Sequence, residues 1–475
     1  MTYKKEEFVR GILWSAVDKF GIVVVQIILE IVMARLLLPS DYGVMGIIAV
    51  FLAIGQVFTD GGFSNALIQK QDRSETDFST VFFCNLIVSV VIYGILFIGA
   101  PYISQFYDLP VLTAIIRIIG LTIIINSLVI VHKTKLSISL NFKIQAKYSL
   151  LSVLLSGAVG LFLALNGYGV WSLVYQTLLL YVLNAVFLIY NLRWVPRFVF
   201  SKKSFDTLFY FGSKVLMASL VQAVYNNLYS VLIAKKFSTK ELGLYSKANQ
   251  FTLFPISTLT TVMQRVAFPY LSSYQGDNDK LFTLNQKFTK LNLILIMPLF
   301  FGISALSEPI VKIVFSDAWI DLIPLMRILS IAFVFYPVIV NNMFLFQIKN
   351  KTQIYLKIEI ITKITGILIL FGTLQYGIVI MSLGLVVQQF LQLVITSMYC
   401  NRLLEKQLFA QLKMVGPHLL VSFLIFFVTL YGISFVDNRF SQFVIGGLLI
   451  GILYFVYYYF FMKNEIVALY VSLKN

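Results

Sequence analysis

The sequence predicts an all-α integral membrane protein with about fourteen transmembrane helices, and three observations carry that prediction. Of the 475 residues, 59% are hydrophobic and 12% are charged, which is about half of the roughly 25% charge that globular domains carry. The mean hydropathy is +0.87. Apolar runs of about 20 residues, the length that spans a bilayer as a helix, recur along the whole chain. A chain with so little water-facing surface needs lipid around it.

The apolar runs follow one another with short connections, as packed helix hairpins should. In order they cover residues 11–36, 42–66, 78–105, 110–132, 146–166, 168–192, 210–234, 241–270, 289–315, 322–347, 355–374, 377–401, 414–436 and 441–462. Asp18 and Lys19 interrupt the first run, and no small-residue cleavage site follows a compact apolar region. We therefore expect this run to be retained as the first helix.

An internal repeat organises these helices. The stretch 34–70 opens with ARLLLPSDYG, and its opening returns about 200 residues later as AKKFSTKELG at 234–243. LTAIIRIIG around Arg117 and LIPLMRILS around Arg327 form a second pair, and NGYGV at 166–170 and LQYGI at 374–378 a third. Repeats at a constant spacing indicate duplicated architecture.

The repeat predicts two six-helix lobes of parallel topology, related by a pseudo-twofold axis along the membrane normal. We place helices 1–6 in an N-lobe of residues 1–200 and helices 7–12 in a C-lobe of residues 201–403. Residues 404–475 hold two extra C-terminal helices. The basic, aromatic-rich segment at 193–206 is the predicted inter-lobe linker.

The net charge of +16 fits membrane topology better than nucleic-acid binding. With the N-terminus in the cytoplasm, the inner segments hold about 24 Lys and Arg and the outer loops about six, a bias typical of cytoplasmic loops. We therefore expect a multi-pass protein of a cytoplasmic membrane with both termini inside. Nucleic acid is not an expected partner.

The sequence offers no signal for catalysis or for a resident metal. Cys84, Cys400, His132 and His418 are isolated from one another, without the spacing of metal ligands, and no P-loop is present. A membrane glycosyltransferase or ligase would need large outer loops or an acidic catalytic motif, and the outer loops here are short. We expect a transporter and not an enzyme, with no cofactor beyond a coupling ion.

Cationic residues at membrane depth predict an anion site, because a charge there is costly and is by default functional. Arg117 and Arg327 are related by the repeat, while Lys247 and Arg265 share one helix face at opposite ends. The predicted anion-binding set is Arg117, Arg327, Lys247, Arg265, Lys19 and Lys214. For Lys214, interfacial snorkelling is an equal alternative.

Amide side chains on the seventh and tenth predicted helices are candidate contacts for hydroxyl groups. They are Gln222, Asn226, Asn227, Asn341 and Asn342. Hydrogen bonding between helices is an equally good reading of each.

The motifs LLLPSDYGVMGI and TDGGFSNALIQ, within two parallel six-helix halves, resemble the Wzx-type polysaccharide flippases of the MOP exporter superfamily. The resemblance covers essentially the whole chain and is closest to the colanic and teichuronic acid exporter branch. It implies a MATE-like fold and alternating-access movement of undecaprenyl-pyrophosphate-linked oligosaccharides across a bacterial inner membrane. Membrane lipids and the polysaccharide polymerase machinery are the other implied partners. A multidrug cation antiporter of the same fold and a lipid II flippase are the alternatives.

The resemblance also implies coupling to an ion gradient. Because carboxylates at depth can bind Na⁺ or take up H⁺, Asp18, Glu30 and Asp60 are the candidate coupling residues. The alternative for Asp18 is an ion pair with Lys19. For Asp60 it is an N-cap or a hydrogen bond at the helix break before Gly61 and Gly62.

Overall fold

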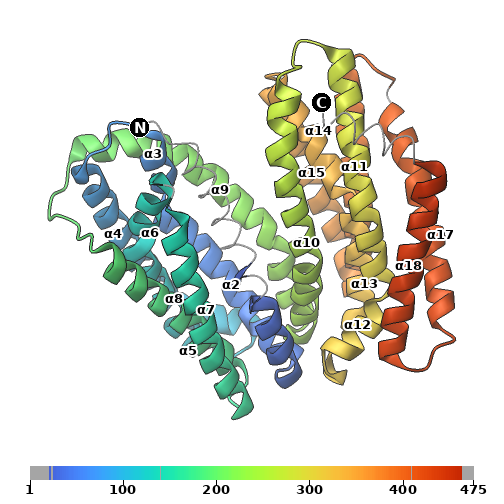
Figure 1. Cartoon of the computed structure of the whole chain (residues 1–475). Coiled ribbons are helices and arrows are strands. Elements are labelled where there is room, and N and C mark those ends of the chain that lie inside the picture. Colours follow the sequence, from blue (N-terminus) through green and yellow to red (C-terminus); the bar gives the residue numbers. More distant parts are fainter. Residues whose placement is uncertain (1–20, 23–24, 140, 408, 463–475) are drawn as a thin grey trace. The chain divides into compact units, whose positions relative to one another are not determined.

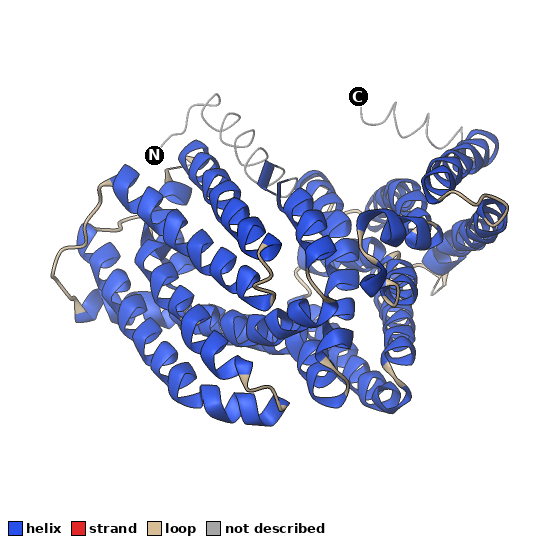
Figure 2. Cartoon of the chain, turned by 90° about the horizontal axis from the view of Figure 1, so that it is seen from below, coloured by secondary structure: helices blue, strands red, loops and turns tan. Residues whose placement is uncertain are grey.

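The computed structural model describes residues 21–22, 25–139, 141–407 and 409–462, apart from the side chains of 254, 257–259, 261–266 and 269. All regular structure among these residues is helical (Figure 2), so the predicted all-α class is confirmed. The chain forms two compact units, Met1–Gly243 and Leu244–Asn475. The predicted division into lobes at residue 200 describes the repeat and stays a prediction.

The first unit holds residues 25–36, which are helical, and a set of antiparallel helices joined by short loops (Figure 1). These are α2 (Pro39–Asp60), α3 (Phe63–Gln69), α4 (Glu75–Tyr107), α5 (Val111–Ile119), α6 (Leu121–Ile138), α7 (Phe142–Leu165), α8 (Val170–Leu192), α9 (Lys202–Lys236) and the start of α10 (Thr239–Ser272). Helix α9 packs along α2 and α3, and α6 packs against α4 and α8. Helices α2, α3, α6 and α9 form the walls of the site described below.

The second unit begins within α10 and is built on a large apolar core. Its further elements are α11 (Asn278–Ala305), α12 (Ser307–Val314), η1 (Asp317–Trp319), α13 (Leu322–Phe333), α14 (Tyr336–Ile348), α15 (Thr352–Thr373), η2 (Leu374–Tyr376), α16 (Ile378–Leu403), α17 (Ala410–Ile433) and α18 (Arg439–Phe461). Phe300, Phe301 and Phe346 are fully buried in this core.

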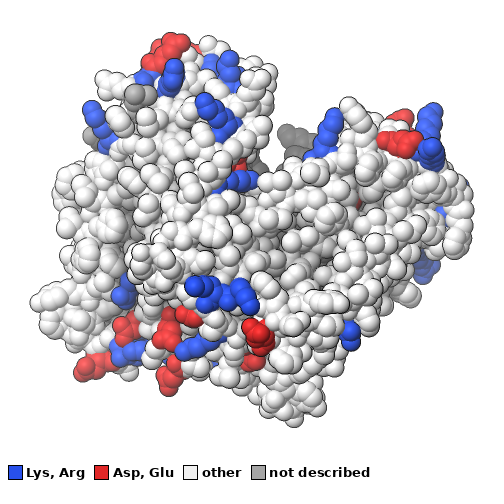
Figure 3. Space-filling model, turned by 180° about the vertical axis from the view of Figure 1, so that it is seen from behind, with Lys and Arg blue, Asp and Glu red and all other residues white. Residues whose placement is uncertain are grey.

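Eleven helical segments in the described part of the chain are long and apolar enough to cross a membrane. They correspond to predicted runs, and large apolar side chains such as Ile98 and Leu424 are exposed on them. On the face shown in Figure 3, charged side chains gather mostly toward the upper and lower parts of the view and leave a broad surface between them largely uncharged.

Three predicted runs fall outside this set. The runs 241–270 and 355–374 are helical as α10 and α15, but they are not among the eleven segments. The run 11–36 lies partly outside the described residues, which within it are 21–22 and 25–36. The count of fourteen transmembrane helices therefore stays a prediction.

The starts of α2 and α10 are equivalent in sequence and contact each other reciprocally. A Cβ on Gly43 would lie 1.8 Å from the Thr239 carbonyl oxygen, and a Cβ on Gly243 would lie 1.8 Å from the Pro39 carbonyl oxygen. Pro39 and Thr239 occupy the same position in the repeat, as Gly43 and Gly243 do. Only glycine permits this approach, which explains why the repeat retains it at both positions.

Candidate functional site

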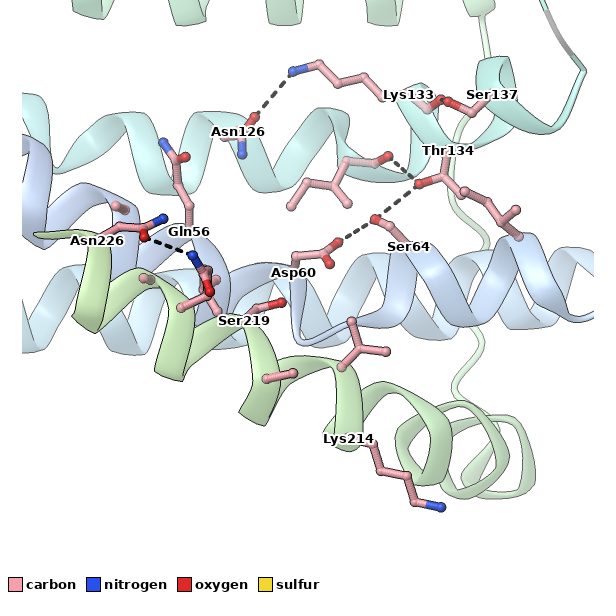
Figure 4. Close-up of a pocket in the computed structure, with 18 of the residues that line it drawn as sticks. Gln56, Asp60, Ser64, Asn126, Lys133, Thr134, Ser137, Lys214, Ser219 and Asn226 are labelled. Carbon is pink, nitrogen blue, oxygen red and sulfur yellow. Dashed lines mark hydrogen bonds between the residues drawn. The ribbon is translucent and has the colours of Figure 1, made fainter. Parts of the chain in front are cut away.

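The first unit contains a cavity of about 1130 Å³ between α2, α3, α6 and α9 (Figure 4). Its wall mixes apolar side chains with a large share of polar ones. The polar lining residues are Gln56, Asp60, Ser64, Asn126, Lys133, Thr134, Ser137, Lys214, Ser219, Gln222, Asn226 and Asn227. Five of these, Asp60, Lys214, Gln222, Asn226 and Asn227, are residues that the sequence predicts as site residues.

A helix break places Asp60 on the cavity wall. Helix α2 ends at Asp60 because Gly61 and Gly62 both adopt left-handed backbone conformations, with φ of +56° and +76°. Gly62 lies against Gly212 of α9, whose carbonyl oxygen would be 2.3 Å from a Cβ on Gly62. The break lies where the Asp-Gly-Gly motif predicts it, and the glycines let α9 approach it directly.

A chain of hydroxyl groups connects Asp60 to α6. Ser64 is the second residue of α3, and its Oγ donates a hydrogen bond to Asp60 Oδ1. Thr134 Oγ1 lies 3.3 Å from Ser64 Oγ, and Figure 4 shows the three side chains in a row. The carboxylate is therefore held by local hydrogen bonding, which agrees with the helix-break alternative for Asp60 and leaves its coupling role a prediction.

The cavity contains two lysines with different settings. Lys133 Nζ lies 3.4 Å from Asn126 Oδ1, within the cavity wall formed by α6. Lys214 points away from the other labelled side chains in Figure 4, and its Nζ lies 4.1 Å from the centre of the Tyr210 ring. Lys133 is thus the better-placed cation for a ligand in this cavity.

Sequence reasoning missed Lys133 because the predicted span ended at residue 132, which assigned this lysine to a loop. Helix α6 instead continues to Ile138. The signal was present in the spacing: Asn126, Lys133, Thr134 and Ser137 recur at intervals that place them on one helix face. Because this polar stripe continues past the end of the apolar run, it could have been used to extend the predicted helix beyond residue 132.

Amide groups supply the rest of the polar wall. Gln222 Nε2 donates to Asn226 Oδ1 at 2.8 Å, and Asn227 Nδ2 donates to the Ala223 carbonyl at 2.8 Å, all on α9. From α2, Gln56 Nε2 donates to the Tyr181 hydroxyl at 2.8 Å. Each amide both donates and accepts, which suits a ligand rich in hydroxyl groups.

The predicted arginines are not part of this cavity. The Arg117 guanidinium lies 4.4 Å from the centre of the Phe97 ring, and its Nε donates to the Phe97 carbonyl at 3.4 Å, so Arg117 packs on α4. Arg327, on α13 of the second unit, has a buried Nε that makes no hydrogen bond to the described residues. A binding role for either arginine stays a prediction.

The remaining predicted cations have separate surroundings. Lys247 is on α10 with 2% of its surface exposed, and its Nζ lies 3.4 Å from Gln250 Oε1. The side chain of Arg265 is not described, although its backbone belongs to α10. Lys19 and Asp18 lie outside the described residues. Glu30 is half-buried in the helical residues 25–36 and does not line the cavity.

The second pair of predicted amides is buried between helices of the second unit. Asn342 donates to Gln411 Oε1 at 2.9 Å and to Ser397 Oγ at 3.3 Å, and Gln411 Nε2 donates back to Asn342 Oδ1 at 2.8 Å. These bonds join α14, α16 and α17, so the contacts of Asn342 favour the interhelical alternative. Its neighbour Asn341 is 3% exposed.

Comparison with known proteins identifies the family of this chain. Residues 32–324, more than half of the chain, match the family described as polysaccharide biosynthesis protein. The chain belongs to this family. The predicted resemblance to proteins of polysaccharide biosynthesis is thereby confirmed, and the matched region includes every wall of the cavity.

Three curated relatives of this family illustrate the similarity. The chain is 24% identical to the teichuronic acid biosynthesis protein TuaB of Bacillus subtilis, over 69% of this chain and 68% of the relative. It is 24% identical to the succinoglycan biosynthesis transport protein ExoT of Rhizobium meliloti, over 70% and 67%. It is 22% identical to the lipopolysaccharide biosynthesis protein WzxC of Escherichia coli, over 69% and 67%.

Two solved structures show the same fold. The lipid II flippase MurJ in an inward closed conformation has a TM-score of 0.76 at 16% identity, with 96% of this chain and 100% of that chain covered. An inward-facing MATE multidrug transporter of the MOP superfamily has a TM-score of 0.62 at 14% identity, covering 83% and 98%. The family member described here is therefore a multi-pass membrane protein with a MATE-like fold.

Proposed function

We propose that this protein translocates undecaprenyl-pyrophosphate-linked oligosaccharide units across the bacterial inner membrane by alternating access, in surface polysaccharide synthesis. It acts as a transporter without catalytic residues. The observation that carries the proposal is the cavity of about 1130 Å³, lined by amides, hydroxyls and two lysines, inside a membrane-spanning unit of a polysaccharide biosynthesis protein.

The cavity chemistry matches the two polar parts of such a substrate. A pyrophosphate cannot enter hydrocarbon without a replacement for its hydration shell, and the Lys133 ammonium provides charge-assisted hydrogen bonds for it. The amides of Gln56, Asn126 and Asn226 can pair with sugar hydroxyls. The cavity exceeds the roughly 300–1,000 Å³ typical of small-molecule pockets, which favours an oligosaccharide over a single sugar.

The alternatives differ from this proposal in substrate. A multidrug cation antiporter would hold an organic cation next to an uncompensated carboxylate, whereas Asp60 already accepts a hydrogen bond from Ser64 and shares the cavity with Lys133. A lipid II flippase would use the same pyrophosphate chemistry with a different sugar. The relatives named for polysaccharide biosynthesis favour the oligosaccharide.

Coupling to Na⁺ or H⁺ is part of the proposal. Of the two candidate carboxylates that the structure describes, Glu30 and Asp60, it is Asp60 that lines the cavity, so an ion bound at Asp60 would lie beside the substrate. Both termini are proposed to lie in the cytoplasm, with membrane lipids around the helices and the polysaccharide polymerase machinery as a downstream partner.

Reconstituted transport tests the proposal. Proteoliposomes would receive a fluorescent undecaprenyl-pyrophosphate oligosaccharide, lipid II or a fluorescent organic cation, each with and without an imposed Na⁺ or H⁺ gradient. We expect movement of the oligosaccharide lipid and little of the cation. Movement of the cation alone would favour the antiporter, and movement of lipid II alone would favour the lipid II flippase.

A further inference from the structure

The segment between α8 and α9, residues 193–201, is an extended strap fixed to the start of α4. The Arg197 backbone N–H donates to Ser79 Oγ at 3.0 Å, and the Ser201 N–H donates to Thr80 Oγ1 at 3.1 Å. The Trp194 indole N–H donates to Glu75 Oε2 at 2.7 Å. Figures 1 and 2 show this loop at the margin of the helices of the first unit. We call this loop together with the first two residues of α9, residues 193–203, the strap segment.

The anchor at Trp194 is reinforced by a cation. Lys135 Nζ lies 2.8 Å from Glu75 Oε1 and 4.4 Å from the centre of the Trp194 ring, so one lysine binds both partners of the indole hydrogen bond. Such contacts between an ammonium and an aromatic face are stabilising. The strap segment is therefore held in a defined place, and its outward side chains are held with it.

Those outward side chains are large and apolar. Phe198 is 95% exposed, Val195 is 74% exposed and Phe200 is 59% exposed. The Phe198 ring lies 5.5 Å from the Phe83 ring of α4, one turn before Ile87, which is itself exposed on this membrane-spanning helix. Phe198 thus packs against α4 about two turns from its start and adds to the exposed apolar surface of this helix.

The same strap segment is strongly basic. Arg193, Arg197, Lys202 and Lys203 are all exposed, and no acidic residue occurs between 193 and 203. The segment joins two membrane-spanning helices, α8 and α9, which sets it at the level of the lipid headgroups. Basic residues at that level are attracted by anionic lipids, and aromatic residues are typical of the interface.

We propose that the strap segment is an anionic-lipid binding site, in which Phe198 and Val195 insert below the phosphates while the four basic residues bind acidic phospholipid headgroups. The fixed backbone aims the apolar side chains in one direction, and the basic residues flank them. This arrangement favours a lipid surface over a protein partner, because charge and apolar groups alternate along one short segment at the height of the headgroups. The inference is independent of what the protein transports.

A depth measurement tests the site in the full-length protein. A spin label would be placed at residue 198 (Phe198→Cys) in a background lacking Cys84 and Cys400, in vesicles of phosphatidylcholine with or without phosphatidylglycerol. The control label is at Gln71, an exposed residue in the loop between α3 and α4 at the same end of the unit. In anionic vesicles we expect an oxygen-to-nickel accessibility ratio at least about tenfold higher at 198 than at 71.

Paired substitutions then test the headgroup contacts. Arg197→Gln with Lys202→Gln should return the label at 198 toward water, whereas Lys143→Gln with Lys147→Gln, an equal loss of charge on α7, should leave it buried. A label at 198 as water-accessible as the one at 71 would overturn the proposal and leave the strap segment open to a protein partner. Equal burial in both lipid mixtures, insensitive to Arg197 and Lys202, would overturn its anionic selectivity.

Discussion

Gly62 belongs to the helix break between Asp60 and Ser64, two residues of the cavity wall. Its φ of +76° disfavours any side chain, and a Cβ there would meet the backbone of Gly212. We expect Gly62→Ala to destabilise the protein by about 1–3 kcal/mol, because strain and backbone displacement add. Thermal unfolding in detergent measures this.

Gly99→Ala is the matched control for that substitution. Gly99 lies within α4, and a Cβ there would have no neighbour within 4 Å, so alanine should be neutral or stabilising by up to about 1 kcal/mol. Equal unfolding temperatures for the Gly62 and Gly99 variants would mean that the break is not under steric constraint.

Residues of the cavity wall could be predicted from the sequence where a polar side chain interrupts an apolar run. Asp60, Lys214 and the amides of α9 were found in this way, and all line the cavity. Lys133 was missed because an apolar window ends before the helix does. Arg117 was expected in a cavity but packs on Phe97, since burial in a sequence window does not say which neighbour a side chain faces.

At the scale of elements, the hydrogen-bonded amides of Asn342 on α14 and Gln411 on α17 allow an effect on stability to be separated from an effect on transport. Asn342→Ala would leave the Gln411 amide, which is 1% exposed, without its reciprocal partner. We expect a loss of about 1–2 kcal/mol of stability, with transport per folded molecule unchanged. The measurements are thermal unfolding and flipping by the same preparation, with Gln71→Ala, an exposed amide, as control.

The transport result decides between the two readings of Asn342. A substantial loss of flipping by a folded Asn342→Ala protein would return this residue to the predicted sugar-contacting set. Unchanged flipping with reduced stability would establish it as a link between helices.

Because the starts of α2 and α10 contact each other reciprocally, we expect the same substitution at Gly43 and at Gly243 to have the same effect on stability. Gly43→Ala and Gly243→Ala each place a Cβ 1.8 Å from a carbonyl oxygen of the other helix. Each should lower the unfolding temperature by a similar amount. The double substitution should lower the unfolding temperature by less than the sum of the two single effects, because either alanine alone already separates the two helix starts.

Additive effects, or tolerance of one alanine and not the other, would contradict an equivalent role of these glycines.

The spacing of the repeat predicted the equivalence of Gly43 and Gly243. Their direct contact could not be predicted, because it depends on how two helix ends approach in space.

At the scale of the whole molecule, composition was sufficient for the fold class and the apolar runs for most helices. Helices α10 and α15 both form at the predicted places, but they are not among the eleven segments whose length and composition suffice to cross a membrane. Polar groups at depth weaken exactly the signal that locates a span, and in transporters such groups belong to the function.

The proposed orientation predicts which loops are accessible from outside the cell. In a background without Cys84 and Cys400, Tyr168→Cys should react with a membrane-impermeant maleimide on intact cells, because the α7–α8 loop is placed outside. Gln71→Cys should react only after permeabilisation, because the basic loops are retained in the cytoplasm. The opposite pattern would invert the assigned topology.

The central claim is that the cavity of the first unit holds the anionic lipid-linked sugar, and one measurement tests it most directly. Flipping of an undecaprenyl-pyrophosphate oligosaccharide would be compared in proteoliposomes containing the unmodified protein, Lys133→Gln with Lys214→Gln, or the control Lys143→Gln with Lys147→Gln. The cavity pair should lower the rate at least about tenfold, because phosphate loses charge-assisted hydrogen bonds, and the control pair should retain it. A folded cavity variant that flips at the unmodified rate, while Arg117→Ala with Arg327→Ala abolishes flipping, would contradict the account and move the substrate site to the arginines.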